Sequence, residues 1–351
     1  MFPDDGRLCE SEDGRFYGII CQVKLSLSTN WCNRRLETGE EIAEKALELG
    51  FSELELGYHT TLLQADGFKR MRERIPVGSI HAFCPVPLSA PQGYPELYSL
   101  ANFDEDGRAL ARVHVLKNIR FAAEMGADTV VLHAGRVSFG SFFSRLDSGA
   151  LSEILREAEK KTDDKKYVKR LAKARTVRTK RGLKMLDLFR AELEKIVPEI
   201  QKQGVTLALE NMPYYEGFPL KGEMDAILDW GFGDCVKAWY DTGHARVCAC
   251  HGWTDAVTGG HDGDGRDGEG AAFGCLASLG CFATRVAGMH LNDVKDLNDD
   301  HLAPGFGNVD FAALKPLAES VRHVVFEPNA GVSEEDLRRG VENIRRIWAL
   351  S

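Results

Sequence analysis

The stretch "VTLALEN" (residues 205–211) is a short apolar run that ends on a carboxylate, Glu210. Short runs rich in Val and Leu are typical of strands buried on both faces of a sheet. A charged side chain at the end of such a run must be compensated for the hydration that burial removes. The stretch therefore predicts a buried strand whose end carries a functional group.

Seven other segments of the chain show the same short, β-rich pattern. They are "YGIICQVKLSL" (17–27), "ELELG" (53–57), "VGSIHAFC" (77–84), "TVVLHAG" (129–135), "VKAWYDTGH" (236–244), "VAGMHLND" (286–293) and "HVVFEPN" (323–329). Helical stretches lie between them. Eight strands, each followed by a helix, predict an α/β fold of the (β/α)8 TIM barrel type. The alternative, a doubly wound sheet, usually has fewer strands.

Two helices can be predicted with their ends. Residues 37–50, "ETGEEIAEKALELG", place Ile42, Ala46 and Leu49 on one face and stop at a glycine suited to a helix C-terminus. Residues 333–350, "SEEDLRRGVENIRRIWAL", begin with Ser333 as N-cap and acidic residues in the first turn. Both helices fit the outer layer of the predicted barrel.

The chain, at 351 residues, exceeds the roughly 250 residues of a typical barrel. We interpret it as a single domain, residues 1–351, with a helical insertion after strand 4 (about 137–200) and a Gly-rich insertion after strand 6 (about 246–284). Within the first, residues 156–184 carry thirteen Lys/Arg and four Asp/Glu, which predicts a basic amphipathic helix. A second helix is expected from about Leu183 to Gln203. A solvated face or a contact between subunits explains most such basic runs; an anionic substrate or nucleic acid is the alternative.

The second insertion contains "TGGHDGDGRDGEGAAFG" (258–274), which superficially resembles a calcium-binding loop. Counted from Asp262, the fifth ligand position holds Arg266, and this breaks the required spacing. A mobile Gly-rich loop, acting as a lid, is the better interpretation.

The overall composition points to a globular protein of the cytoplasm. The net charge of −9 argues against general affinity for nucleic acid or anionic membranes, and neither a signal peptide nor an apolar run long enough to span a membrane is visible. Nine scattered cysteines fit reduced thiols better than a disulfide framework. "CACH" (248–251) hints at a metal, but no second Cys/His pair stands at zinc-finger spacing.

The predicted strands end in side chains that can bind metal ions. These are His81, His133, Glu210, Asp241 with His244, His290 followed by Asp299 and His301, and Glu327. In a barrel all strand ends point to one face, so the residues should converge there. Imidazole and carboxylate donors suit Mn²⁺ or Zn²⁺, with Mg²⁺ and Co²⁺ as alternatives, rather than copper or iron–sulfur clusters. A divalent metal site is therefore expected.

The motifs "IHAFCP", "VLHAGR", "LALENMP", "YDTGHAR", "MHLNDVKD", "DDHLAPGFGNVDF" and "VFEPN" resemble those of the xylose isomerase-like TIM barrel superfamily. That superfamily includes sugar-phosphate isomerases and epimerases together with the family 2 abasic-site (AP) endonucleases of the endonuclease IV type. The resemblance runs from about strand 2 to the C-terminus and excludes both insertions. It is specific for the superfamily but not for one activity.

For the ketose epimerase branch, the resemblance implies one Mn²⁺-like ion held by Glu210, Asp241, His290 and Glu327. The two glutamates, Glu210 and Glu327, would act as acid and base on opposite faces of a sugar, through an enediolate stabilised by the metal. His244 would contact a substrate oxygen. Asn292 stands where these epimerases often have a second histidine, which weakens the match to that substrate class.

For the nuclease branch, the resemblance implies a trinuclear zinc site, and all of its nine ligand positions find suitable residues here. The four residues above are joined by His81, His133, His244, Asp299 and His301. Clustered ions favour hydrolysis of phosphate esters by a bound hydroxide.

Lys295 could contact an anionic substrate group, with a surface salt bridge as the alternative. The "GFGN" turn (305–308) could hold a phosphate, but such a turn needs glycines in any case.

We therefore predict a metal-dependent enzyme that isomerises or epimerises a sugar or sugar phosphate. The alternative is an endonuclease IV-like zinc phosphodiesterase, the only case in which nucleic acid would be a partner. The acidic chain and the segments "LALENMP" and "DTGHAR" favour the sugar enzyme, while the nine-ligand match and the basic helix favour phosphate chemistry. Further alternatives are a related lyase or dehydratase and a non-catalytic binding protein. The chain could also form a homo-oligomer.

Overall fold

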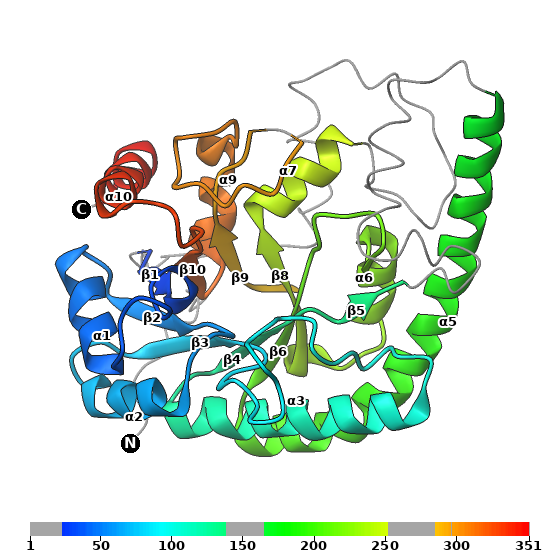
Figure 1. Cartoon of the computed structure of the whole chain (residues 1–351), viewed down its shortest axis with the longest axis horizontal. Coiled ribbons are helices and arrows are strands. Elements are labelled where there is room, and N and C mark those ends of the chain that lie inside the picture. Colours follow the sequence, from blue (N-terminus) through cyan, green and yellow to red (C-terminus); the bar gives the residue numbers. More distant parts are fainter. Residues whose placement is uncertain (1–22, 138–164, 252–284, 296, 351) are drawn as a thin grey trace, which may run out of the picture.

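The computed structural model describes residues 23–137, 165–251, 285–295 and 297–350 (Figure 1). The Gly-rich stretch 258–274, the first part of the basic run and the start of the first predicted strand lie outside these residues. None of the described helices is both long enough and apolar enough to cross a membrane.

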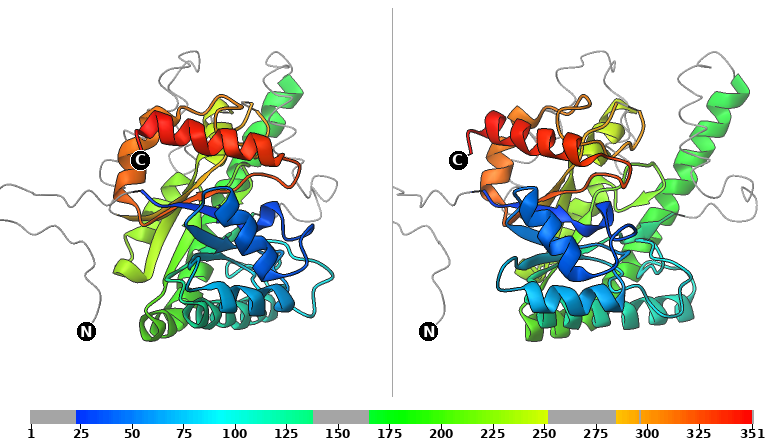
Figure 2. Two further views of the ribbon diagram at one scale, coloured as in Figure 1. Left: turned by 90° about the vertical axis from the view of Figure 1, so that its left-hand side faces the viewer. Right: turned by 60° about the vertical axis from the view of Figure 1, so that its left-hand side comes forward.

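Eight parallel strands form a closed barrel in the order β1-β10-β9-β8-β6-β4-β3-β2. Their bounds are β1 Leu25–Ser28, β2 Glu53–Leu56, β3 Val77–His81, β4 Thr129–Leu132, β6 Thr206–Glu210, β8 Val236–Asp241, β9 Val286–Leu291 and β10 His323–Phe326. Each of the eight predicted segments overlaps one of these strands. The prediction of a (β/α)8 TIM barrel is confirmed, with helices on the outside of the barrel (Figure 2).

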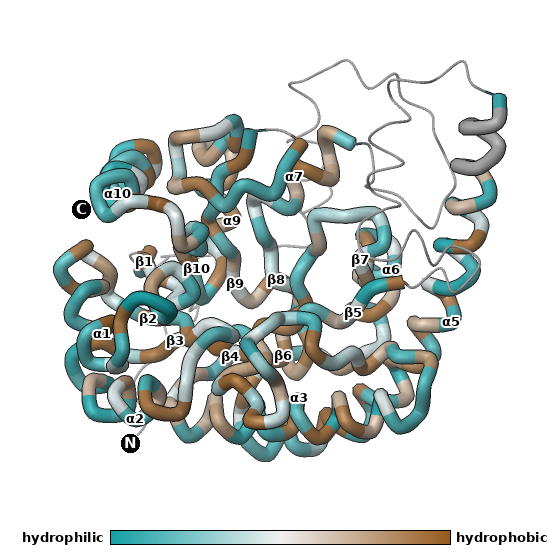
Figure 3. The backbone as a smooth tube through the Cα atoms, viewed as in Figure 1, coloured by the Kyte–Doolittle hydropathy of each residue, from teal (hydrophilic) through white to brown (hydrophobic). Residues whose placement is uncertain are grey.

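The helices are α1 Gly39–Glu48, α2 Leu62–Met71, α3 Glu105–Met125, α5 Lys165–Gln203, α6 Lys221–Leu228, α7 Thr242–Cys250, α9 Phe311–Ser320 and α10 Glu334–Trp348. Short 3-10 turns are η1 Thr29–Trp31 and η3 Gly233–Cys235, and a small antiparallel pair joins β5 Gly135–Arg136 to β7 Gly217–Phe218. Thr38 and Glu41 form a capping box at α1, and the hydroxyl of Ser333 caps α10 as predicted. Hydrophobic and hydrophilic residues alternate along α3 and α5, as expected of helices with one face on the barrel (Figure 3).

The prediction of two separate helices between the basic run and Gln203 is wrong, because α5 is one helix of 39 residues. Its C-terminal part packs on the barrel through Phe189, Leu193, Ile196 and Ile200, which are fully buried. Its N-terminal part projects beyond the barrel (Figure 2). The expected start of a second helix near Leu183 is absent, and Gly182, the residue before it, is helical.

Gly182 is required by packing rather than by a turn. A Cβ at this position would lie 2.0 Å from Glu223 Oε1 and 2.3 Å from Arg178 Nη1. Arg178, part of the predicted basic run, is completely buried: it donates to Glu223 Oε1 (2.7 Å), to the Tyr215 carbonyl (3.0 Å) and to the Gly217 carbonyl (2.6 Å). The basic run is therefore not uniformly solvated, and α5 is tied to the segment that follows β6.

Candidate metal centre

All nine predicted donor residues lie at the carboxyl ends of the barrel strands or in the segments that directly follow them, and the structure brings them together. Their donor atoms form three groups, each with all atoms within 4.8 Å of one another: His81, His133 and Glu210; Glu210, Asp241, His290 and Glu327; and His244, Asp299 and His301. Strand register explains part of this convergence, since Asp241 on β8 pairs with His290 on β9. Glu210 belongs to two of the groups.

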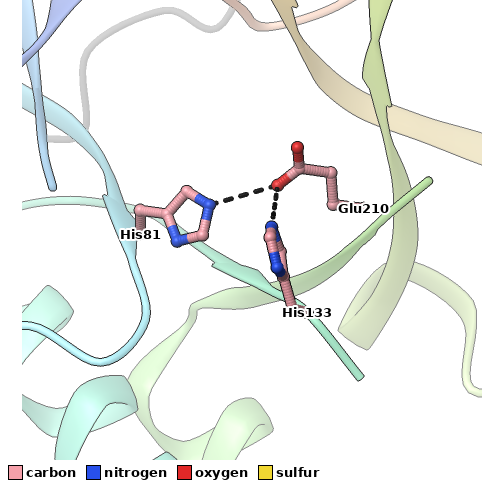
Figure 4. A group of neighbouring side chains, drawn as sticks. All are labelled: His81, His133 and Glu210. Carbon is pink, nitrogen blue, oxygen red and sulfur yellow. Dashed lines mark hydrogen bonds and ion pairs between the residues drawn. The ribbon is translucent and has the colours of Figure 1, made fainter. Parts of the chain in front are cut away.

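In the first group two imidazoles contact the same carboxylate oxygen (Figure 4). His81 Nε2 lies 3.1 Å and His133 Nε2 lies 3.0 Å from Glu210 Oε2. His81 Nδ1 lies 3.0 Å from the Ala82 carbonyl, so both ring nitrogens of His81 face acceptors. A neutral imidazole carries only one N–H, so a proton or a metal ion is needed between His81 and Glu210.

The second group is the most deeply buried. Glu210, Asp241 and His290 have no exposed surface, and Glu327 is 5% exposed. His290 Nδ1 lies 3.4 Å from Glu210 Oε1, 3.6 Å from Asp241 Oδ2 and 3.2 Å from Glu327 Oε2. Amide groups hold the carboxylates in place, because Asn292 Nδ2 donates to Asp241 Oδ2 at 2.6 Å and Asn30 Nδ2 donates to Glu327 Oε1 at 3.3 Å.

The third group combines α7 with the loop after β9. His244 Nε2 lies 3.5 Å from Asp299 Oδ2, and His301 Nε2 lies 3.2 Å from Asp299 Oδ1. His301 Nδ1 faces the Glu327 carbonyl at 2.8 Å, which again leaves an imidazole between two acceptors. The backbone of His301 is in the left-handed region (φ 46°), a conformation that non-glycine residues rarely adopt.

Asp293 holds that loop in place. Its fully buried carboxylate accepts N–H bonds from Gly305 and Gly307 at Oδ2 (2.8 Å each) and from Val294 (3.0 Å) and Val309 (2.9 Å) at Oδ1. In the "GFGN" turn, the N–H groups of Gly305 and Gly307 are therefore bonded to Asp293, and those of Phe306 and Asn308 are bonded to backbone carbonyls, so none is left for a phosphate. Glycine at position 307 allows the backbone to come close to the carboxylate, because a Cβ on Gly307 would lie 2.5 Å from Asp293 Oδ1.

The charges of the site depend strongly on one another. Burial alone would raise the pKa of Glu210, but His133 and His290 hold that pKa well below its usual range. Burial would lower the pKa of His290, but Glu327, Glu55 and Glu210 raise it well above 6.5. Burial opposes the charge of His301 also, yet Asp299 raises its pKa to about 10. The ionised carboxylates of this site are therefore stabilised by positive charge beside them.

The donor set fits divalent ions. Within the described residues, the ion-pair partners of Glu210, Asp241 and Glu327 are all histidines, and neither a lysine nor an arginine neutralises them. Buried carboxylates persist only when they are paired or when they bind a metal. Mixed oxygen and imidazole donors suit Zn²⁺ and Mn²⁺. All nine predicted residues could serve as ligands.

The sequence interpretation missed Glu55 on β2, which is fully buried and lies 3.1 Å from His290 Nε2. The alternation in "ELEL" could have revealed it, since Glu53 and Glu55 share the strand face opposite Leu54 and Leu56. It also missed Asn211, whose side chain accepts from the Asp241 N–H at 2.8 Å.

A cavity of about 170 Å³ opens next to the donors. Its lining includes His81, His133, Glu210, His244, Asp299, His301 and Glu327, together with Tyr58, Tyr94, Glu96, Arg136 and Tyr214. Arg136 stacks on the Tyr214 ring at 3.8 Å and forms an ion pair with Glu96 at 3.3 Å. Lys295, the predicted anion contact, is exposed and does not line this cavity.

The family described as the xylose isomerase-like TIM barrel matches residues 43–347. The chain belongs to the xylose isomerase-like TIM barrel family. The resemblance inferred from the motifs is thereby confirmed for the family. No curated protein sequence matches the chain.

Several solved structures share the fold of this chain at low sequence identity. A D-tagatose 3-epimerase-like protein is 19% identical, over 93% of this chain and 97% of that chain, with a TM-score of 0.61. The 3-keto-D-glucoside 4-epimerase of E. coli is 14% identical, over 93% and 100%, with a TM-score of 0.62. A protein of Thermus thermophilus, from a crystal soaked with ZnCl2, is 20% identical over 94% and 99%, with a TM-score of 0.53. These likenesses show that the chain shares the overall fold of these proteins.

Proposed function

We propose that this protein is a divalent-metal-dependent enzyme that isomerises or epimerises a small sugar or sugar phosphate. One observation carries the proposal: the buried donors Glu210, Asp241, His290 and Glu327 converge, and both glutamates of the group line a small cavity. This is the group that the epimerase resemblance implies. The solved epimerases with the same fold support the substrate class.

In this proposal the two glutamates move protons. Glu210 on β6 and Glu327 after β10 reach the group from strands separated by β8 and β9, so they can face a bound sugar from two sides. One removes the proton next to the carbonyl and the other returns a proton to the opposite face. A bound divalent ion would polarise the carbonyl and stabilise the negative charge that develops. His81 and His244 would contact the substrate oxygens.

The cavity supports a small polar substrate. Its volume of about 170 Å³ is below the roughly 300–1,000 Å³ of sites for drug-sized ligands. Its walls combine hydrogen-bonding groups with the Tyr58 and Tyr214 rings. Aromatic rings and polar groups together suit a molecule with hydroxyl groups and C–H faces.

The proposal is tested by Glu210→Gln and Glu327→Gln in the metal-loaded protein. Candidate ketoses and their phosphates are incubated in D2O, and incorporation of deuterium at the carbon next to the carbonyl is followed by NMR. The wild type should incorporate deuterium and each variant should lose at least about 100-fold in rate, within the 10²–10⁴-fold contribution of general acid–base catalysis. Wild-type exchange rates in both variants would refute the assignment.

A second candidate is metal-dependent hydrolysis of a phosphate ester, including abasic-site DNA. The specific support is the third donor group, His244, Asp299 and His301, which one-ion proton transfer does not need. The position of Glu210 also suits a bridge, because Oε2 faces His81 and His133 while Oε1 faces His290 and His244. Two or three ions, if held by these groups, would activate water and stabilise the charge on the phosphoryl group.

Metal content and one variant separate the two candidates. One ion per chain, with deuterium exchange retained in Asp299→Asn, supports the sugar enzyme. Two or three ions, with cleavage of an abasic-site duplex that Asp299→Asn abolishes, supports the hydrolase. A purified protein that binds no divalent ion would instead favour a non-catalytic binding protein.

We also propose a cytoplasmic location and reduced thiols. Three of the described cysteines, Cys32, Cys84 and Cys235, form no disulfide, which supports a reducing compartment. Labelling of thiols in the freshly isolated protein under denaturing conditions would test this: nine reactive thiols per chain are expected.

A further inference from the structure

Glu55 is a buried carboxylate outside the nine donors. It lies on β2, has no exposed surface, and its two oxygens lie 3.1 and 3.2 Å from His290 Nε2. Ser79, its register partner on β3, donates its hydroxyl to Glu55 Oε2 at 2.9 Å. Burial of a charged group at this depth is costly, so these contacts call for a specific explanation.

The opposite edge of the His290 ring faces the metal-binding group. Nδ1 lies 3.2–3.6 Å from the carboxylates of Glu210, Asp241 and Glu327. An ionised carboxylate only accepts hydrogen bonds, so each ring nitrogen needs a proton or a metal ion beside it. When a metal ion lies among the three carboxylates next to Nδ1, the proton is on Nε2 and is donated to Glu55. In a neutral imidazole this leaves the lone pair on Nδ1, directed at the group.

Packing holds the ring in this orientation. The His290 ring is stacked parallel to His81 at 5.8 Å with an interplanar angle of 7°, and the edge of Trp239 contacts it at 5.1 Å. These contacts restrain the plane of the ring, and Glu55 is the group beside Nε2 that can determine which ring nitrogen carries the proton.

We propose that Glu55 is a positioning residue that fixes the tautomer of His290 and so prepares Nδ1 to bind a divalent ion. The inference rests on the proposed metal site. A carboxylate behind a metal-binding histidine also increases the basicity of the imidazole, and removal of such a partner typically costs about 10–100-fold in metal affinity.

Glu53 provides a matched control on the same strand and the same face. It contacts His323 Nδ1 at 3.2 Å and accepts from the Ser26 hydroxyl at 2.7 Å, toward the N-terminal end of the strand. Glu53→Gln therefore also removes a carboxylate next to a buried histidine, but it leaves His290 untouched. A general effect of lost charge inside the barrel would appear in both variants.

The experiment measures Zn²⁺ affinity by competition with a chromophoric chelator for the wild type, Glu55→Gln and Glu53→Gln, with circular dichroism to verify the fold. We expect a loss of about 10–100-fold for Glu55→Gln and no change for Glu53→Gln. In the Zn²⁺-loaded wild type, the Nε2–H of His290 should give a strongly downfield proton signal in ¹H–¹⁵N spectra, and Glu55→Gln should shift this signal upfield.

Three results would overturn the inference. Equal affinity in Glu55→Gln and wild type removes it and leaves the proposed function intact, as does an equal loss in Glu53→Gln. A wild-type protein that binds no Zn²⁺ removes the proposed metal site and this inference together. If Glu55→Gln does not fold, Ser79→Ala takes its place: a loss of several-fold supports the inference, and an unchanged affinity refutes it.

Discussion

Asp293→Asn should loosen the loop that carries Asp299 and His301. The variant keeps one oxygen, so the N–H groups of Val294 and Val309 keep an acceptor. The N–H groups of Gly305 and Gly307, which now donate to Oδ2 at 2.8 Å, would face an amide NH2. Each unpaired buried donor costs about 1–3 kcal/mol, and two give about 2–6 kcal/mol. Because Gly305 is exposed and water can reach it, we expect about 2–4 kcal/mol.

The assay is equilibrium unfolding in urea followed by circular dichroism, together with Zn²⁺ titration. Asp300→Asn is the matched control. Asp300 lies in the same loop and accepts one N–H bond, from Lys295 at 2.8 Å, near the surface. Loss of that single exposed contact should cost less than about 1 kcal/mol.

The Zn²⁺ titration adds a local measurement. If Asp293 orders the third donor group, Asp293→Asn should weaken any ion bound by His244, Asp299 and His301 more than an ion bound at Glu210. An unfolding free energy of Asp293→Asn within about 0.5 kcal/mol of the wild type, in the range of an ordinary surface substitution, would refute the role assigned to the Asp293 carboxylate.

Three further predictions concern stability. Burial opposes the charge of His323, but hydrogen bonds to Asp128 and Glu53 raise its pKa from 6.5 to about 9; the stabilisation is complete below pH 6.5 and is lost as the pH rises through 9. The wild type should therefore be more stable than His323→Gln at pH 6, and this difference in unfolding free energy should shrink by roughly 3 kcal/mol as the pH rises to 10. A difference that does not change with pH in urea unfolding would contradict this. Arg178→Met leaves Glu223 buried without its partner, so guanidinium unfolding should show a loss of about 3–5 kcal/mol, which a loss below about 1 kcal/mol would exclude. Removal of metal with EDTA should lower the Tm, and Zn²⁺ or Mn²⁺ should restore it; a Tm insensitive to both treatments would count against a bound ion.

The fold could be predicted from the sequence because each strand carries its own signal. Short apolar runs such as "TVVL" and "TLALE" are buried on both faces in a parallel barrel, and turn residues separate them from helices. The donors could be predicted for the same reason: Glu210, Asp241 and His290 are polar residues that end apolar strands, and the barrel topology brings such ends to one face.

The missed features depend on contacts between distant segments. Glu55 lies inside an alternating strand, and its role is visible only when His290, 235 residues away in the chain, is placed beside it. The continuity of α5 through Gly182 depends on such a contact too, because a glycine is unfavourable inside a helix and this one makes room for the ion pair of Arg178 with Glu223. Local propensity does not encode either contact.

The anchoring of α5 by Arg178 bears on how this barrel could be shortened or grafted. The same guanidinium that pairs with Glu223 also binds the carbonyls of Tyr215 and Gly217, immediately after Tyr214 of the cavity wall. A deletion of the outer end of α5 that stops before Arg178 would keep these contacts to the cavity wall. A deletion that includes Arg178 would remove them. A segment fused to the projecting N-terminal end of α5 is therefore compatible with the site only as long as Arg178 and the helix C-terminal to it are unchanged.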